Sequence, residues 1–411
     1  MIGLNRNLNT KVKKLLTLFP AVILLGARQT GKTTLARQVA PDWHYLDLEK
    51  PSHFNQLHHD PEFYFEQHPR HLLIDEAQCY PELFNILRGV IDERREETGR
   101  FLITGSSSPE ILRQACDSLA GRVALVEMGT LKVNEYYQQP LSPFYKIFQE
   151  KLTKENWAFD GTPPFSTEQI QHVWLKGGYP QALLAHSEEE YLQWMENYHA
   201  TYLNRDVAAL FPKLNRIAYQ RFLSMLSHLS STIINKAELG RAIEISETTV
   251  REYLTIAEGS FIWRQLLSFE KKITKSLVKM PKGYIRDSGL LHYLLKIQTR
   301  TALYENIMVG HSFEAFVIEE LIKGLQATMV TNWQHNYYRT RNGAEIDVIL
   351  DGPFGTLPIE IKYGSTVPLR NLRSLQDFIK EHNLPFGLVI NQAKKGEWLT
   401  RDIYQLPVGW L

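Results

Sequence analysis

The most specific chemical pattern in the sequence is the stretch AVILLGARQTGKTTLARQVA, an apolar run followed by a glycine-rich loop and a helix-forming segment. The loop fits G-x-x-x-x-G-K-[ST], with Gly26, Gly31, Lys32 and Thr33 at the fixed positions and Thr34 beside them. Glycines allow backbone N–H groups to turn inward around phosphate oxygens, and the helix N-terminus adds a partial positive charge. We expect Lys32 to reach the β- and γ-phosphates and Thr33 to bind Mg²⁺. The pattern predicts a nucleoside triphosphate site, with Thr34 as a further contact.

Two later apolar runs end in polar residues that suit the same site. HLLIDEAQ ends in Asp75 and Glu76, and RFLITGSSS ends in Thr104 and Ser106. Asp75 is placed to hold the Mg²⁺ water shell, and Glu76 is placed to polarise the attacking water. The hydroxyls of Thr104 and Ser106 are candidates for sensing the γ-phosphate. The order and spacing of these runs after the phosphate loop predict that this part of the chain binds ATP or GTP.

A second group of charged residues lies near the C-terminus, in GAEIDVILDGPFGTLPIEIK. Both apolar runs of this stretch alternate with period 2, which places Asp347 on the polar side of one strand and Glu360 and Lys362 on the polar side of the next. Upstream, GHSFEAFVIEEL predicts a helix that carries Glu314 among apolar neighbours. Carboxylates with a nearby lysine suit Mg²⁺-dependent cleavage of a phosphodiester. The alternative is an ordinary hairpin with a charged, solvated face.

The stretches GARQTGKTTLA, LLIDEAQCYPELFNILRGVID, FLITGSSS and SLAGRV resemble the prokaryotic AAA-type P-loop ATPases whose C-terminal half is a domain of unknown function. The resemblance implies ATP rather than GTP, which agrees with the absence of an N-K-x-D motif. It also implies that Arg122 senses phosphate or acts as an arginine finger; the alternative is a helix-end arginine paired with a neighbour. The helix–hairpin order near the C-terminus resembles the PD-(D/E)xK restriction-endonuclease-like fold. Glu314, Asp347, Glu360 and Lys362 match its signature positions.

Between these regions, residues 216–290 are predicted to form three helices followed by a β-wing. The predicted wing carries seven basic residues against one acidic residue, Glu270, and this surplus suits contact with a phosphate backbone. Winged helices also serve as protein-interaction modules, so both functions stay open. The basic residues are Arg264, Lys271, Lys272, Lys275, Lys279, Lys282 and Arg286.

Composition limits the class of protein. The chain has 411 residues, a formal net charge of +1, 44% hydrophobic residues and 22% charged residues, as in globular proteins. A net charge near zero excludes a global basic field, so any nucleic-acid site must be a local patch. The apolar run AVILLG is too short to span a bilayer, and two cysteines without metal-binding spacing indicate a reducing compartment. We therefore predict a cytoplasmic protein.

These patterns together predict a multidomain α/β protein. We expect an AAA-type P-loop ATPase core at 1–150, a linker and helical lid at 151–215, a winged helix at 216–298 and a nuclease-like α/β domain at 299–411. The expected function is ATP hydrolysis coupled to DNA binding, with Mg²⁺-dependent DNA cleavage as a further expectation and ATP, Mg²⁺ and DNA as ligands. An arginine finger acting across subunits would require a homo-oligomer. The alternative is a nucleotide-dependent switch that binds protein partners through a non-catalytic nuclease-like fold.

Overall fold

The computed structural model describes residues 3–106, 118–157, 159, 161–202, 207, 211, 214–270, 280–340 and 343–411. The chain forms two compact units. The first comprises Met1–Leu131 with Thr255–Ile262, and the second comprises Lys132–Leu254 with Trp263–Leu411. Residues 132–150, predicted within the ATPase core, lie in the second unit.

The first unit is built on a parallel sheet with the strand order β2-β3-β4-β1-β5. Every residue of β1 and β3 is buried, which explains why the sequence shows continuous apolar runs rather than alternation. Since the strands are parallel, their carboxyl ends share one edge of the sheet, where the glycine-rich loop follows β1. The strands are β1 (Ala21–Gly26), β2 (His44–Asp47), β3 (Leu72–Asp75), β4 (Phe101–Ser106) and β5 (Val123–Glu127).

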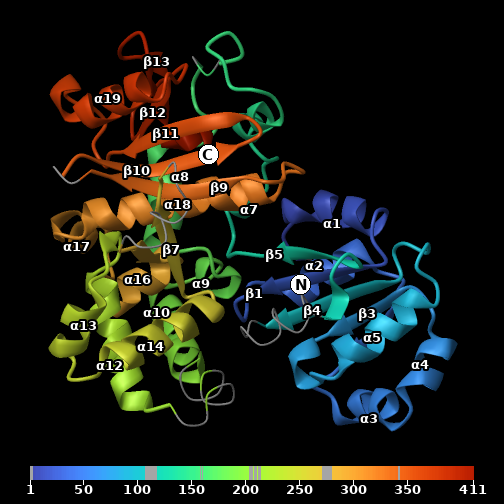
Figure 1. Ribbon diagram of the computed structural model, residues 1–411. Coiled ribbons are helices and arrows are strands. Elements are labelled where there is room, and N and C mark those ends of the chain that lie inside the picture. The colour runs from blue at the N-terminus through green and yellow to red at the C-terminus, as the bar shows by residue number, and fades with distance from the viewer. Residues whose placement is uncertain are drawn as a thin grey trace. The chain divides into compact units, whose positions relative to one another are not determined.

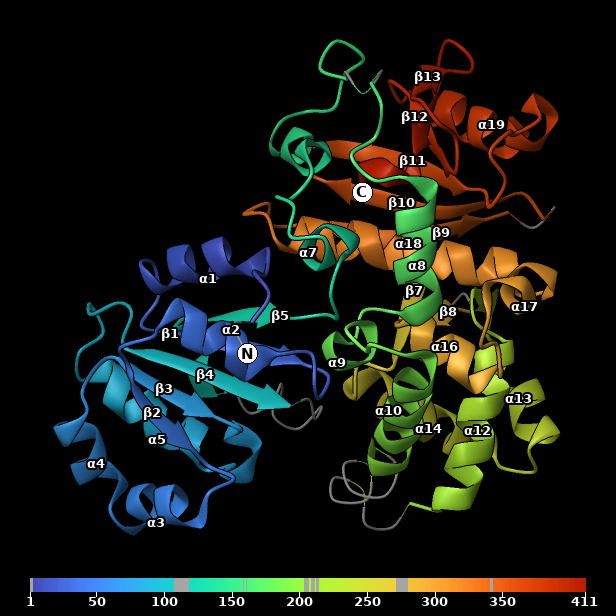
Figure 2. The ribbon, with the colours of Figure 1, turned by 180° about the vertical axis from the view of Figure 1, so that it is seen from behind.

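Helices cover both faces of this sheet, as Figures 1 and 2 show from opposite sides. One face is covered by α1 (Leu8–Leu16) and α2 (Lys32–Val39). The other face is covered by α3 (Pro51–His59), α4 (Pro61–Gln67) and α5 (Leu83–Asp92), whose apolar side chains join those of β1, β3 and β4 in one core. This two-sided burial fixes the strand ends that carry the candidate nucleotide site.

The second unit contains a long mixed sheet with the order β13-β14-β12-β11-β10-β9-β7-β8-β6 among the described residues. β7 pairs in parallel with β9 through Leu267–Asn336 and Ser268–Tyr337, so the middle of the chain and its C-terminal part share this sheet. The strands are β6 (Thr232–Ile233), β7 (Trp263–Ser268), β8 (Lys282–Ile285), β9 (Gln334–Arg339), β10 (Glu345–Gly352), β11 (Gly355–Ile361), β12 (Gly387–Asn391), β13 (Glu397–Trp398) and β14 (Ile403–Pro407).

The helices of the second unit fall into two groups. Before β6, the first strand of the sheet along the chain, lie α7 (Val133–Tyr136), α8 (Thr167–Lys176), α9 (Pro180–Leu183), α10 (Glu188–Thr201) and α12 (Arg216–His228). Between its strands lie α13 (Lys236–Ala242), α14 (Glu247–Gly259), α16 (Ser288–Leu294), α17 (Arg300–Glu305), α18 (Val309–Gln326) and α19 (Arg373–Glu381), and α14 enters the first unit from Thr255 on. α19 packs its apolar face on β10, β12 and β14, and no helix among the described residues is long and apolar enough to cross a membrane.

Candidate nucleotide site and C-terminal carboxylates

The glycine-rich loop between β1 and α2 is held open by two glycines. Gly31 adopts a φ of 95°, in the left-handed region that glycine favours, directly before the first turn of α2. A Cβ on Gly26 would lie 2.2 Å from the backbone oxygen of Met128, so only glycine fits there. Lys32 is buried, and its Nζ donates to the carbonyl oxygens of Gly26 and Ala27, each at 2.9 Å. The ammonium group is therefore already directed into the loop, where phosphate oxygens would lie.

Asp75 at the end of β3 accepts hydrogen bonds from three hydroxyl groups. Thr33 Oγ1 lies 3.0 and 2.9 Å from its two carboxylate oxygens, Tyr45 OH donates at 2.7 Å, and Thr104 Oγ1 donates as well. Burial and the bond to Asp75 raise the pKa of the Tyr45 phenol, so this hydroxyl stays a donor. Two hard-oxygen groups, Thr33 and Asp75, thus meet beside the phosphate loop. Their donor set fits Mg²⁺.

Glu76 follows Asp75 with a φ of 58°, an uncommon left-handed conformation for this residue type. Its backbone N–H donates to Thr104 Oγ1 at 3.3 Å, and its carboxylate accepts a short hydrogen bond from Gln78 Nε2. The carboxylate predicted to polarise water is thus oriented by a neighbouring amide.

The other predicted residues of the nucleotide site have different surroundings. Thr34 is exposed in the first turn of α2. Ser106 ends β4, and its side chain lies outside the described residues. Arg122 forms two hydrogen bonds with the carboxylate of Asp92 on α5, at 2.7 and 2.8 Å. In this structure its guanidinium is paired with a neighbouring acid.

The structure brings the four predicted C-terminal residues together. Asp347 on β10 accepts a 2.7 Å hydrogen bond from the N–H of Ile361, next to Glu360, and Lys362 Nζ pairs with Glu360 at 2.5 Å. Burial is the main cause that raises the pKa of Glu314 to about 8, and burial and then Asp347 raise that of Glu360 to about 8. Asp347 and Glu360 are each only 8% exposed, so this side of the hairpin is not a solvated face.

A fifth residue, Lys282 on β8, enters this group. Its Nζ lies 2.7 Å from Glu314, 2.7 Å from Glu345 and 3.6 Å from Asp347. The described residues contain no group of three or more His, Cys, Asp or Glu side chains arranged to hold a metal ion. Since a cation of the chain itself stands among the carboxylates, these residues do not fit a divalent metal ion.

Two more basic residues of the predicted wing are also paired inside the second unit. Arg264 on β7 and Arg286 lie 2.5 and 3.4 Å from the carboxylate of Glu319 on α18, and their side chains are only 10% and 8% exposed. Together with Lys282, three of the seven wing cations are therefore buried in ion pairs. Lys271, Lys272, Lys275 and Lys279 lie outside the described residues.

Comparison with known families finds three matching segments along the chain. An AAA domain matches residues 18–137. Two domains of unknown function match residues 167–301 (DUF8612) and 309–411 (DUF4143). Uncharacterized proteins of Mycobacterium tuberculosis (strain ATCC 25618 / H37Rv) and Mycobacterium bovis (strain ATCC BAA-935 / AF2122/97) are each 35% identical over 376 residues, covering 90% of this chain and 76% of theirs. The chain belongs to this family of AAA-domain P-loop ATPases.

Solved structures resemble this AAA-domain ATPase more distantly. A Walker-type ATPase of Pyrococcus abyssi is 13% identical, with a TM-score of 0.40. The match covers 70% of this chain and 94% of that protein's chain. The RuvB Holliday junction branch migration motor of Thermotoga maritima is 14% identical, with a TM-score of 0.30. The match covers 62% of this chain and 89% of that protein's chain. At these scores the likeness carries no argument about partners.

Three residues of the AAA-domain ATPase were missed by sequence reasoning. Tyr45 and Gln78 belong to no recognisable sequence motif. The pairing of β2 with β3 brings Tyr45 to Asp75, and the turn after β3 brings Gln78 to Glu76. Lys282 was counted as a surface cation because the alternation of its segment fits a wing. Lys282 forms ion pairs with carboxylates far along the chain, and no local sequence pattern indicates such pairs.

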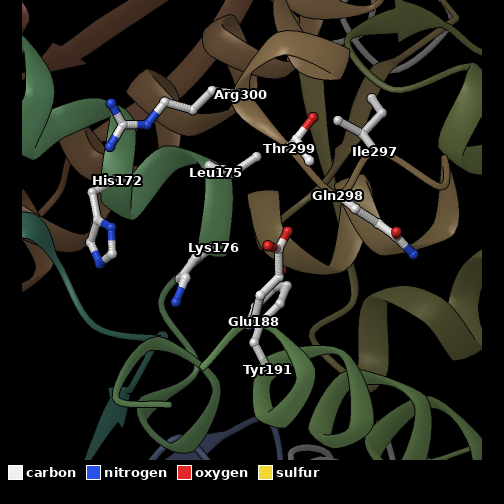
Figure 3. Close-up of a pocket in the computed structure, with 9 residues that line it drawn as sticks. All are labelled: His172, Leu175, Lys176, Glu188, Tyr191, Ile297, Gln298, Thr299 and Arg300. Carbon is white, nitrogen blue, oxygen red and sulfur yellow. The ribbon is translucent and has the colours of Figure 1, made fainter. Parts of the chain in front are cut away.

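The second unit of the AAA-domain ATPase also contains a cavity of about 310 Å³ between α8, α10 and residues 297–300. Figure 3 shows Lys176 and His172 on α8 and Arg300 from the facing segment, with Glu188 and Tyr191 rising from α10. Burial, followed by the charges of Lys176 and Arg300, lowers the pKa of His172. The lining is thus mixed, with more basic than acidic groups.

Proposed function

We propose that the protein binds and hydrolyses ATP at the loop between β1 and α2. The observation that carries this proposal is the contact of Thr33 with Asp75 beside a loop into which Lys32 already points. When ATP binds, Lys32 exchanges its two backbone acceptors for phosphate oxygens. Bound Mg²⁺ supplies charge neutralisation, and Thr33 and Asp75 are the residues that would hold it.

The attacking water is proposed to be oriented by Glu76. Gln78 Nε2 holds this carboxylate, and Thr104 holds the backbone N–H of the same residue, so its position is fixed before the nucleotide arrives. A general base or water-orienting group must lie within hydrogen-bond reach of the water, and the edge of the sheet next to Asp75 provides such a place.

The test is steady-state ATP hydrolysis by three variants. Lys32→Ala and Glu76→Gln are expected to lower kcat by about 100-fold or more, as when one preorganised group is removed from a phosphoryl-transfer site. Lys50→Ala removes an exposed lysine of the same unit, and it should leave the rate unchanged. Hydrolysis by Lys32→Ala within about twofold of the wild type would refute the assignment.

DNA binding by the second unit is proposed on two structural arguments. The order α12, β6, α13, α14, β7, β8, with β8 between β6 and β7 in the sheet, supports a winged-helix assignment for this segment. The order of α18 and the hairpin β10–β11 supports a nuclease-like fold for the C-terminal segment. The predicted cleavage is not supported to the same degree, because Lys282 stands among the carboxylates that would hold the metal ion.

The proposed DNA contact is therefore assigned to the other four basic residues of the predicted wing, which lie outside the described residues. The test is retention of duplex DNA at increasing salt by the wild type and by a variant with Lys271, Lys272, Lys275 and Lys279 replaced by Gln. The variant should bind more weakly and with a shallower salt dependence, since each lost phosphate contact lowers the slope. If the wild type retains no DNA at low salt, the alternative of a nucleotide-dependent switch for protein partners holds instead.

A further inference from the structure

The ammonium group of Lys282 is surrounded by three carboxylates that come from two parts of the chain. We call Glu314, Glu345 and Asp347 the carboxylate cluster. Nζ lies 2.7 Å from Glu314 Oε1, 2.7 Å from Glu345 Oε1 and 3.6 Å from Asp347 Oδ1. The contact with Glu345 is a hydrogen bond, and the contacts with Glu314 and Asp347 are ion pairs.

Burial makes this arrangement costly unless the charges are matched. The Lys282 side chain is 3% exposed, and those of Glu314 and Asp347 are 11% and 12% exposed. Burial lowers the pKa of Lys282, but Glu314, Asp347 and Glu345 raise it more, so the pKa lies above its ordinary value and the lysine is charged. A buried charge of this kind is stable only with partners in place.

The backbone of Lys282 fixes the position of the ammonium group. The residue lies in β8, between β6 and β7, opposite Ile233 on one side and Leu266 on the other. β7 continues the same sheet into β9 and β10, and β10 carries two of the three carboxylates. Lys282 is therefore anchored in the sheet that also carries its partners, unlike a surface lysine that can swing away.

We propose that Lys282 is the resident cation of the carboxylate cluster and that it excludes a divalent metal ion from this place. A metal ion bound by the same oxygen atoms would lie about 2.0–2.6 Å from them, in the space that Nζ fills. The two positive charges would also repel each other in a poorly hydrated environment. The inference concerns the second unit alone and is independent of the nucleotide site.

The first experiment measures Mn²⁺ binding by the full-length wild type and by Asp347→Asn, without nucleotide, by equilibrium dialysis at millimolar Mn²⁺. Equal binding by the two proteins is the expected result, because the cluster takes up no metal ion when Lys282 is present. One additional Mn²⁺ per chain in the wild type would overturn the proposal. This comparison does not depend on the folding of any variant at Lys282.

The second experiment replaces the lysine. Lys282→Met keeps most of the side-chain volume and removes the charge, so the cluster should gain one Mn²⁺ per chain, and Mn²⁺ should raise the melting temperature of the variant. Adding Asp347→Asn should remove both effects. Arg264→Met is the matched control: it breaks another buried ion pair on the neighbouring strand but leaves only the single carboxylate of Glu319, which still faces Arg286. A folded Lys282→Met protein that binds no more Mn²⁺ than this control would overturn the proposal.

Discussion

Protonation of His292 provides a quantitative test of the packing in the second unit. The imidazole is fully buried on α16, with Nδ1–H donating to the carbonyl oxygen of Leu175 at 2.8 Å and Nε2 accepting from Ser312 Oγ at 2.6 Å. Ser312 Oγ accepts in turn from Trp174 Nε1 at 2.9 Å. Burial lowers the pKa of His292 from 6.5 to about 4, so the ring is neutral in the folded protein.

The sign and size of the effect follow from the two pKa values. Between pH 6.5 and about 4 the unfolded chain binds a proton that the folded chain does not, so the free energy of unfolding falls as the pH falls through this window. The loss of stability is complete once the pH falls below about 4, the pKa of His292 in the folded state. Above pH 6.5, the unfolded-state pKa, the imidazole is neutral in both states, so His292 adds no pH dependence to stability. A difference of 2.5 pKa units (6.5 − 4) corresponds to about 3 kcal/mol.

The assay is chemical denaturation of the wild type and of His292→Gln at several pH values, followed by tryptophan fluorescence. Glu314 and Glu360 have raised pKa values, so they make the free energy of unfolding fall as the pH rises from about 4.5 to 8. Both proteins share this effect, so the difference between their free energies of unfolding isolates the contribution of His292. We expect the wild type's advantage over the variant to shrink by about 3 kcal/mol between neutral pH and the folded pKa. A difference that stays constant with pH would refute the buried, neutral imidazole.

Three further predictions test other contacts. Lys132→Met removes the ammonium group from a fully buried ion pair with Glu320. The free energy of unfolding, measured by chemical denaturation, should fall by about 3–5 kcal/mol. The double variant Lys132→Met with Glu320→Gln should recover part of this loss, because no unpaired charge stays buried. Tyr45→Phe removes one of three hydroxyl groups from Asp75 and should raise the Mg²⁺ concentration for half-maximal ATP hydrolysis about tenfold, with ATP affinity little changed. Gly26→Ala would bring a Cβ within 2.2 Å of a backbone oxygen, so ATP binding measured by calorimetry should be lost.

The nucleotide site could be predicted because its residues are linked by local rules. Gly31, Lys32 and Thr33 form one contiguous loop and helix start, and the acidic residue Asp75 ends a buried strand. The carboxyl ends of parallel strands meet at one edge of a sheet, so sequence order alone brings these groups together. The comparison with AAA domains confirms the ATPase class of this part of the chain.

The surroundings of the C-terminal residues could not be predicted in the same way. Period-2 alternation in β10 identifies two faces, yet every residue from Ile346 to Leu350 is buried, because both sides are covered. A bulge between Ile346 and Ile349 interrupts the pairing with β9 as well. Lys282 reaches Glu345 across 63 residues, through a strand pairing that only the folded sheet defines. Non-local pairing of this kind leaves no signal in a window of ten or twenty residues.

The pairing of β7 with β9 has a consequence for how this protein can be divided. The segments that match the two domains of unknown function meet at this pair of strands, so cutting the chain between them exposes a row of backbone N–H and C=O groups on each fragment. Unpaired strand edges of this kind recruit other chains. Either fragment expressed alone would tend to aggregate, and coexpressed fragments would tend to reassociate through the same edge. The boundary between the two sequence families thus divides two neighbouring strands of one continuous sheet.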